Sequence, residues 1–365
     1  MKPFKGKTLL ILLHFLRDLI LFIEACKKAG ASPQDTIIFY KDYQYPNKEE
    51  IKAHLEKGGY KIYSVKEIDS ALGKLRLEGV GKIIVIEDGG VIVPKLQKDF
   101  KKLATLTLGA VEQTTKGIRN DQQIEGLSFP VISIPGSKFK DTFEPPHVAR
   151  AVVNNIQQLL PDKNFSGRSA LVIGYGNIGE QIALQFRDTL KMKLSVYDSD
   201  MTRLIKAQQC GFDTEENLRE GVKEKFLIVG ATGERVVGRS EILAMEHNVY
   251  LVSASSEQWE FCISELDALS SEKSDLLHNG EKIGTKYKIR NTERQVNLIA
   301  DGYPINFWET ESMPNEVSDL IMSLIFVSAA EIAINQSLPT GINSNITNEL
   351  AERYELSKIY LEYHK

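Results

Sequence analysis

Residues 174–179 read Gly-Tyr-Gly-Asn-Ile-Gly, a glycine spacing that binds a dinucleotide when a strand precedes it and a helix follows it. The flanking residues predict that strand and that helix, and Asp198 closes the next strand, 22 residues after Gly176. The three glycines would permit a tight turn, a close approach to the pyrophosphate, and packing of the helix on the sheet. Asp198 would accept hydrogen bonds from ribose hydroxyls and repel a 2′-phosphate, which predicts NAD rather than NADP. The predicted cofactor-binding residues are Gly174, Gly176, Asn177, Ile178, Gly179 and Asp198.

A second glycine-rich turn, residues 230–233, ends another apolar stretch. In a dinucleotide-binding domain, contacts to the ribose and phosphate on the nicotinamide side would come from such a turn. We therefore add Ala231, Thr232 and Gly233 to the predicted cofactor contacts. A plain strand-to-helix turn is the alternative interpretation of this stretch taken alone.

Short apolar runs alternate with amphipathic stretches along the first 150 residues and again after Pro161. This alternation predicts strands and helices of an α/β protein rather than a helical bundle. The 365 residues are enough for two domains with full cores. Between the two series, a helix entered through Pro145 and Pro146 and stopped by Pro161 is predicted to be a hinge.

Composition and charge exclude several classes of function. Hydrophobic residues make up 42% and charged residues 26%, which is typical of a soluble globular protein. The 45 basic and 49 acidic residues are mixed along the chain, so we expect a small-molecule ligand rather than a nucleic acid. Cys26, Cys210 and Cys262 are odd in number, far apart and without neighbouring histidines, so we predict neither a disulfide framework nor a metal site.

Two apolar segments could be mistaken for membrane or export signals. Residues 8–15 are soon followed by charged residues and by no cleavage site, so we interpret them as core. The predicted helix 315–335 carries Asp319 and Glu331, and its apolar part is too short and too interrupted to span a membrane. We interpret it as a buried interdomain or subunit-interface helix, and expect a cytoplasmic homo-oligomer that does not contact a membrane.

Six stretches, in order along the chain, resemble motifs of the S-adenosylhomocysteine hydrolase family. They are Leu13-His14, IEDGG (86–90), GAVEQTTKG (109–117), SKFKD (137–141), GYGNIG (174–179) and ADGYPIN (300–306). The family has a Leu-His motif, an Asp-Gly-Gly turn, and Glu-Glu-Thr-Thr-Thr-Gly, Lys-Phe-Asp-Asn, Gly-Tyr-Gly-Asp-Val-Gly and Ala-Glu-Gly-Arg-Leu-Val-Asn segments in this order. The resemblance covers about residues 8–335, and six ordered matches are more specific than any single one.

The resemblance implies two doubly wound α/β domains, the central one a Rossmann domain that binds NAD, joined by hinge helices. We assign residues 1–145, completed by the returning helix 315–336, to a substrate domain, 146–314 to the NAD domain and 337–365 to a C-terminal tail. In such enzymes NAD transiently oxidises the 3′-hydroxyl of a nucleoside to a ketone. The C4′ proton then becomes removable, the 5′ substituent can leave, and the cofactor is regenerated.

The resemblance also assigns Thr114, Thr115 and Asn306 to the NAD site. For the two threonines the alternative is that β-branched side chains simply fill a strand end. Asn306 could equally be a turn residue.

On the substrate side, His14 and Asp88 match residues that the family uses close to the reacting sugar, and they are our candidates for proton transfer. A core histidine and a turn-forming aspartate are the alternatives. Gln113 stands where the family has a working glutamate, and an amide cannot serve as a carboxylate base.

Other substrate positions also depart from the family pattern. Lys138 and Asp141 are the nearest match to the family's reactive lysine and aspartate, but are out of register by one or two positions. Either the loop presents them to the site in a new way or they are solvated surface charges. Ser256 and Met313 stand near positions where the family has histidines, and the C-terminal tail has no equivalent of the family's segment that reaches a neighbouring protomer's NAD.

The NAD contacts are thus kept while the substrate contacts are changed. This predicts an NAD-dependent, adenosylhomocysteinase-like enzyme that oxidises a ribose hydroxyl of a nucleoside or related sugar-containing molecule, with elimination or hydration at the 4′,5′ position as a further step. Hydrolysis of S-adenosylhomocysteine itself and a catalytically inert NAD-binding regulator are the alternatives.

Overall fold

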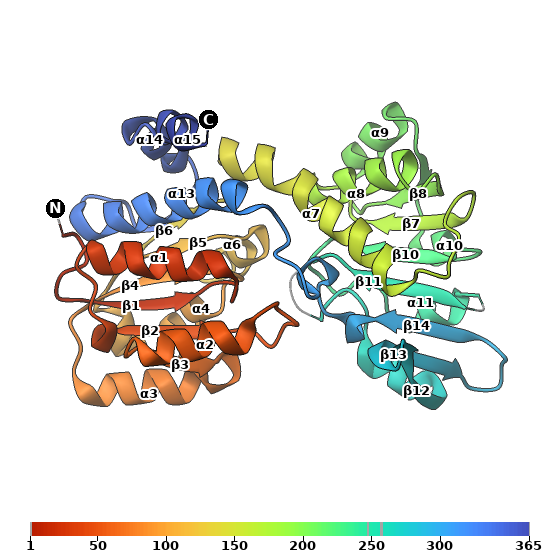
Figure 1. Cartoon of the computed structure of the whole chain (residues 1–365), viewed down its shortest axis with the longest axis horizontal. Coiled ribbons are helices and arrows are strands. Elements are labelled where there is room, and N and C mark those ends of the chain that lie inside the picture. Colours follow the sequence, from red (N-terminus) through yellow and green to blue (C-terminus); the bar gives the residue numbers. More distant parts are fainter. Residues whose placement is uncertain (1, 247, 256–257, 365) are drawn as a thin grey trace. The chain divides into compact units, whose positions relative to one another are not determined.

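The computed structural model describes residues 2–246, 248–255 and 258–364. The chain divides into two compact units, Met1–Glu144 with Met313–Lys365, and Pro145–Ser312. Each unit is built on its own sheet, and helices flank both sheets (Figure 1).

The sheet of the first unit has seven parallel strands in the order β15-β6-β5-β4-β1-β2-β3. The strands are β1 (Lys7–Leu12), β2 (Thr36–Tyr40), β3 (Lys61–Ser64), β4 (Lys82–Glu87), β5 (Thr107–Glu112), β6 (Pro130–Ser133) and β15 (Gly341–Asn343). From β1 the chain adds β2 and β3 on one side of the sheet, and from β4 it adds β5, β6 and β15 on the other side. The adjacent strands β1 and β4 therefore form the switch point of a doubly wound sheet, where such folds bind ligands.

Helices cover both faces of this sheet, which explains why its strands are nearly continuous runs of buried aliphatic residues. On one face, α3, α4 and α6 pack against Leu10 and Leu12 of β1 and their neighbours. On the other face, α1 and α2 are joined by α13, which returns from the far end of the chain. The helices of this unit are α1 (Arg17–Lys28), α2 (Lys48–Lys57), α3 (Ile68–Glu78), α4 (Ile92–Lys98), α5 (Lys101–Ala104), α6 (Thr115–Gln122), α13 (Asn315–Ile334), α14 (Ile346–Arg353) and α15 (Leu356–Tyr363).

The second unit contains an eight-stranded sheet in the order β12-β13-β14-β11-β10-β7-β8-β9. The strands are β7 (Ser169–Ile173), β8 (Lys193–Tyr197), β9 (Asp213–Glu215), β10 (Leu227–Gly230), β11 (Val249–Ser253), β12 (Ser270–His278), β13 (Glu281–Ile289) and β14 (Gln295–Ile299). Six neighbouring strands of this sheet, β9, β8, β7, β10, β11 and β14, are parallel. Their arrangement is the 3-2-1-4-5-6 order of a Rossmann fold, with the switch point between β7 and β10. The antiparallel hairpin β12–β13 extends the sheet. Together, the two sheets confirm the predicted fold class.

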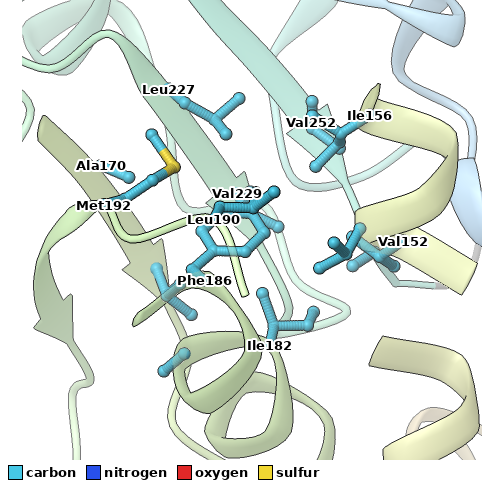
Figure 2. Close-up of a cluster of buried hydrophobic side chains, with 14 of the residues drawn as sticks. Val152, Ile156, Ala170, Ile182, Phe186, Leu190, Met192, Leu227, Val229 and Val252 are labelled. Carbon is cyan, nitrogen blue, oxygen red and sulfur yellow. The ribbon is translucent and has the colours of Figure 1, made fainter. Parts of the chain in front are cut away.

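The second unit has two hydrophobic clusters, and one of them lies between its sheet and helices α7 and α8. Figure 2 shows Val152 and Ile156 of α7, together with Ile182 and Phe186 of α8, among side chains from β7, β10 and β11. The remaining helices of this unit are short. The helices are α7 (Lys138–Leu159), of which the part from Pro145 belongs to this unit, α8 (Asn177–Asp188), α9 (Met201–Gln209), α10 (Leu218–Gly221), α11 (Arg239–Ala244) and α12 (Ile263–Leu269).

Helix α7 differs from the prediction at its beginning. It starts at Lys138, so that Pro145 and Pro146 lie inside the helix rather than at its entrance. Proline's fixed φ is compatible with a helix, and the cost is two backbone hydrogen bonds that lack an N–H donor. The predicted end before Pro161 is confirmed.

Helix α13 is long and apolar enough to cross a membrane by length and composition, so the prediction that it is too short was wrong. Its burial supports a different role, because 61% of its most apolar stretch is buried within the structure. Ser318 of α13 also donates a hydrogen bond to the carboxylate of Asp18 in α1. A core helix of the first unit explains these observations.

Candidate functional site

In the first unit, the predicted catalytic residues meet at the switch point of the sheet. His14 follows β1 and Asp88 follows β4, and the two parallel strands are neighbours. The carboxyl ends of parallel strands share one edge of a sheet, so residues far apart in sequence come together there. The imidazole Nε2 of His14 lies 3.0 Å from Oδ2 of Asp88.

The second ring nitrogen of His14 also has a partner. Nδ1 lies 2.8 Å from the hydroxyl oxygen of Tyr45, and the rings of Tyr43 and Tyr45 flank the imidazole. In a neutral ring with the proton on Nε2, Nδ1 would accept from the Tyr45 hydroxyl and Nε2 would face the Asp88 carboxylate. The contacts thus fix the ring orientation. A side chain with this arrangement is suited to proton transfer, and not only to packing.

Lys41 is a site residue that sequence reasoning missed. It follows β2, and its ammonium group forms an ion pair with Oδ1 of Asp88. Its side chain is 3% exposed and that of Asp88 is 1% exposed, so this is a fully buried charge pair. The structure thereby places a buried lysine beside His14 and Asp88, after a strand that carries none of the recognised motifs.

The two neighbours determine the charge of Asp88. Burial alone would raise its pKa, but His14 and Lys41, through charge and hydrogen bonds, hold the pKa well below its usual range. Asp88 is therefore a carboxylate at neutral pH. It can orient His14 and compensate the charge of Lys41 in surroundings that exclude water.

A buried carboxylate holds the turn that carries Asp88. Oε1 of Glu112 accepts from the backbone N–H of Gly89 at 2.9 Å, and Oε2 accepts from that of Gly90 at 2.9 Å. The neighbouring Gln113 is 8% exposed, and its Oε1 has no hydrogen-bond partner among the described residues. A buried amide oxygen beside the turn without a protein partner suits a hydrogen-bond donor from a ligand.

Thr114 and Thr115, predicted to contact NAD, begin helix α6. The Thr114 hydroxyl donates to Oε1 of Glu112 at 2.6 Å and accepts from the Gly117 N–H at 3.0 Å, as a helix cap. Both hydrogen-bonding directions of this hydroxyl are thus used within the first unit. Thr115 is exposed at the first helical position. Their roles toward a cofactor stay predictions.

Lys138 and Asp141 lie in the first turn of α7, and both side chains are exposed. The Lys138 backbone N–H donates to Oδ1 of Asn348 at 2.9 Å, and Oδ1 of Asp141 accepts from the Gly136 N–H at 3.4 Å. Neither contact involves His14 or Asp88. In the described part of the chain, the buried lysine at this edge of the sheet is Lys41.

The second unit builds the predicted dinucleotide turn between β7 and α8. Gly174 has φ +95°, and a Cβ there would lie 2.9 Å from the Thr232 side chain. A Cβ at Gly179 would lie 1.8 Å from the Gly174 carbonyl oxygen, so only glycine lets the helix approach the strand. At Gly176 the nearest atom to such a Cβ is an Arg203 nitrogen at 3.7 Å, which leaves this face open. The tight turn at Gly174 and the helix packing at Gly179 are as predicted, and the approach of a pyrophosphate to Gly176 stays a prediction.

Helix α8 begins at Asn177 and Ile178, and no side chain caps its amino terminus. The first-turn N–H groups of a helix attract anions through unpaired donors and the helix dipole. The open turn and the uncapped helix therefore suit a pyrophosphate.

Asp198 lies at the end of β8, beside this turn. Its Oδ2 accepts from the Tyr175 N–H at 2.6 Å, and its Oδ1 accepts from the Asp200 N–H at 2.9 Å. A carboxylate oxygen can accept more than one hydrogen bond, so both remain able to accept from ribose hydroxyls. Arg203, whose Nη1 lies 3.4 Å from Oδ2, was not predicted as part of the site.

The second glycine-rich turn is organised by Glu260, which sequence reasoning also missed. Glu260 is fully buried, and its carboxylate accepts from the N–H groups of Thr232 at 2.6 Å and Gly233 at 2.7 Å. The Thr232 hydroxyl also donates to it, at 2.9 Å. These two N–H groups are therefore engaged within the protein, and Ala231 is half-buried. Their predicted cofactor contacts stay predictions.

Asn306 is 4% exposed, and its Nδ2 donates to the Ser312 hydroxyl at 3.0 Å. Its Oδ1 is buried and has no partner among the described residues. Such an orphaned acceptor suits a donor from a bound ligand. Together with the glycine cradle and Asp198, it fits a dinucleotide in the second unit.

Two positions that depart from the family pattern give little further information. Ser256 lies outside the described residues. Met313 is half-buried in the first unit, immediately before α13.

A cavity of about 720 Å³ in the second unit lies away from the dinucleotide turn. Its lining includes Arg168, Phe226 and Asn248, which directly precede β7, β10 and β11. The glycine-rich turns follow β7 and β10 instead. Because the strands are parallel, the cavity and the glycine-rich turns lie at opposite edges of the sheet.

Comparison with known proteins supports the resemblance found in the sequence. The chain is 25% identical to the adenosylhomocysteinase of Sulfolobus acidocaldarius over 370 residues, which cover 98% of this chain and 85% of that protein. It is 25% identical to the adenosylhomocysteinase of Thermococcus kodakarensis, covering 92% of this chain and 79% of that protein. It is also 26% identical to the S-inosyl-L-homocysteine hydrolase of Methanopyrus kandleri, covering 91% and 78%. The chain is thus similar to adenosylhomocysteinases along nearly its whole length.

No family model matches the chain. Among solved structures, a dipicolinate synthase chain from Bacillus halodurans aligns with 89% of this chain and 99% of its own length, at 12% identity and a TM-score of 0.47.

Proposed function

We propose that the protein is an NAD-dependent enzyme that acts on a nucleoside thioether or a related nucleoside by transient oxidation of a ribose hydroxyl. The observation that carries this proposal is the buried group formed by His14, Lys41 and Asp88 at the switch point of the first unit. An inert NAD-binding regulator would have no reason to keep a buried charge pair there, because such pairs are costly and seldom add net stability.

The second unit would hold the cofactor. Gly174, Gly176 and Gly179 would cradle the pyrophosphate, Asp198 would bind the adenosine ribose, and the orphaned Oδ1 of Asn306 would accept from the ligand. When bound, NAD supplies a hydride acceptor that converts a sugar hydroxyl to a ketone and later returns the hydride.

The first unit would supply the proton transfers. In a neutral ring, the Tyr45 hydroxyl donates to Nδ1 of His14, so a proton that reaches the Tyr45 oxygen can pass to the imidazole. Asp88 then stabilises the positive charge on the ring, as its depressed pKa allows. The Lys41 ammonium keeps Asp88 ionised and adds positive field at the site.

The names of the relatives indicate which nucleosides to test. Two related activities act on the adenosyl and inosyl thioethers of homocysteine. We infer a substrate of this thioether class. The change from the family's glutamate to Gln113, whose buried oxygen lacks a partner among the described residues, favours a substrate that offers a hydrogen-bond donor to this position.

The experiment is to incubate the purified protein, loaded with NAD, with S-adenosylhomocysteine, S-inosylhomocysteine, adenosine and inosine. Release of a thiol and absorbance of reduced cofactor are measured for each compound. We expect turnover with at least one thioether, a loss of at least a hundredfold with Asp88→Asn, and no loss with the exposed control Asp35→Asn. Stoichiometric NAD that no nucleoside reduces would instead support the inert regulator. Turnover of adenosylhomocysteine alone would identify the authentic hydrolase.

A further inference from the structure

Three carboxyl groups are buried together beneath the turn that carries Asp88. Glu87 ends β4, Glu112 ends β5 and Asp121 lies in α6, and each residue is 0% exposed. One oxygen from each lies within 4.8 Å of the others. Three anions at this spacing without solvent would repel one another strongly, so the cluster requires a compensating proton or cation.

Backbone groups already supply most of the hydrogen bonds of two members. The Glu87 carboxylate accepts from the N–H groups of Val91 (2.8 Å), Ile92 (2.6 Å) and Val93 (3.0 Å). The Glu112 carboxylate accepts from the N–H groups of Gly89, Gly90 and Thr114 and from the Thr114 hydroxyl. Both residues therefore hold the chain around Asp88. Their N–H donors favour the carboxylate form, but burial outweighs them and raises the pKa of Glu87. Burial with the neighbouring carboxylates raises the pKa of Glu112 to about 8, so both residues can share a proton with Asp121.

Asp121 differs from the other two. Neither of its oxygens has a hydrogen-bond partner among the described residues, although the side chain is completely buried. An ionised carboxylate without a single donor is the most costly member of such a cluster. Asp121 is thus the group that would bind a proton most readily.

Among the described residues, no cation from the packed elements compensates Asp121. The nearby Lys41 is already paired with Asp88. On α4, Lys95 pairs with Asp69 and Asp99 near the surface, and Lys98 is exposed. Strand β15 (Gly341–Asn343) carries no charged side chain.

The charged residues of α6 itself do not change this balance. Lys116 and Arg119 are partly exposed and have interactions of their own. The anions that face Asp121 are Glu87 and Glu112.

We propose that Asp121 carries a proton and shares it with the Glu87 and Glu112 carboxylates, and so acts as a positioning residue for the turn that holds Asp88. This inference rests on the proposed function only in the catalytic role given to Asp88. A proton explains the cluster better than a metal ion, because N–H groups already point at Glu87 and Glu112.

The shared proton gives folding a definite pH dependence. Burial, together with the charges of Glu87 and Glu112, raises the pKa of Asp121 to about 9, whereas an aspartate in the unfolded chain ionises near pH 4. Between these values the folded protein keeps a proton that the unfolded chain has lost. One such proton lowers the folding equilibrium constant about tenfold for each pH unit of increase through this window, and the effect levels off above it.

The test compares wild-type protein with Asp121→Asn, Asp121→Ala and the exposed control Asp35→Asn by urea unfolding between about pH 6 and about pH 8. Asparagine keeps the volume of the neutral acid and can donate hydrogen bonds, so we expect Asp121→Asn to fold. The folding constant of wild type should fall with increasing pH more steeply than that of Asp121→Asn. The difference between the two slopes should be about tenfold per pH unit. Asp121→Ala should be the least stable variant at every pH.

A second measurement does not depend on any variant folding. Infrared spectra of the wild-type protein at neutral pH should contain the carbonyl stretch of a protonated carboxylic acid, and this band should disappear above about pH 9. In the Asp121→Asn variant the band should be absent at neutral pH, where ordinary carboxyl groups are ionised. In activity assays, we expect kcat of the wild type to fall at alkaline pH as the shared proton is lost. The fall should be smaller in the Asp121→Asn variant.

Three results would overturn the proposal: equal pH slopes for wild type and Asp121→Asn, no protonated acid band, or a stoichiometric divalent metal that Asp121→Asn fails to bind. The unfolding and infrared measurements need neither cofactor nor substrate. Their failure would leave the proposed enzymatic function standing, and an absence of nucleoside turnover would leave the shared proton unaffected.

Discussion

Replacement of Lys41 by methionine tests whether the buried pair with Asp88 exists as described. Methionine is close to lysine in length and apolar, so the change removes the charge with little change in packing. The side chains of Lys41 and Asp88 are 3% and 1% exposed, and breaking such a pair by removing one partner costs about 3–5 kcal/mol. Because the 3.0 Å contact of Asp88 with His14 remains, we expect Lys41→Met to lower the free energy of unfolding by about 3 kcal/mol at neutral pH, the lower end of this range.

The double variant Lys41→Met with Asp88→Asn provides the decisive comparison. It removes the orphaned charge, so we expect it to recover about half or more of the stability lost in Lys41→Met. The exposed control Lys28→Met should change the free energy of unfolding by less than about 0.5 kcal/mol. All variants are measured by urea unfolding at neutral pH without cofactor.

The pair of Lys41 and Asp88 also predicts how the stability of the folded protein changes at acidic pH. The pKa of Asp88 is held below its unfolded value, so its stabilisation is present above about pH 4 and is lost as the pH falls through the folded pKa. Lys41→Met should reduce this acid-dependent loss. The reasoning is refuted if Lys41→Met is no more destabilising than Lys28→Met, or if the two single effects simply add in the double variant.

Three further substitutions test the second unit. Gly179→Ala should abolish NAD binding measured by calorimetry and destabilise the second unit, because its Cβ would lie 1.8 Å from the Gly174 carbonyl oxygen. The control is Gly73→Ala in helix α3, where an added Cβ meets no atom within 4 Å; it should raise the free energy of unfolding by up to about 1 kcal/mol. Glu260→Ala removes the oxygen that accepts from the N–H groups of both Thr232 and Gly233, and we expect a loss of about 2 kcal/mol in thermal or urea unfolding; an unchanged stability would mean that this carboxylate does not hold the turn. Asp198→Ala should weaken NAD at least tenfold and weaken NADP less, as measured by fluorescence titration; equal losses for the two cofactors would contradict ribose recognition by Asp198.

Local sequence patterns predicted the strand, the glycine-rich turn and the helix of the segment around Gly176, and dinucleotide binding there stays a prediction. The strand, glycine-rich turn and helix around Gly176 are contiguous, and each glycine role depends on backbone geometry within a few residues. His14 and Asp88 were found only because a family resemblance marked both. Their meeting depends on β1 and β4 being neighbours, which no local pattern reveals.

The site residues that the sequence did not predict were missed for a common physical reason. Lys41 and Glu260 are charged residues that local sequence reading assigns to the surface, yet both are buried because partners from distant segments satisfy them. Thr114 shows a contact that the resemblance alone does not reveal, because its hydroxyl serves as a helix cap with Glu112, and its role toward a cofactor stays a prediction. Lys138 shows that a matching residue type near a motif can lie on the surface when the loop register differs.

Hydrogen exchange at a single carbon tests the central proposal most directly. Transient oxidation at C3′ makes the C4′ proton acidic, so a nucleoside thioether recovered from the enzyme in heavy water should gain one deuterium at C4′. We predict this incorporation with S-adenosylhomocysteine or S-inosylhomocysteine, and its loss in Asp88→Asn. If neither compound gains deuterium from the NAD-loaded wild-type protein, the proposed oxidation of the sugar is contradicted.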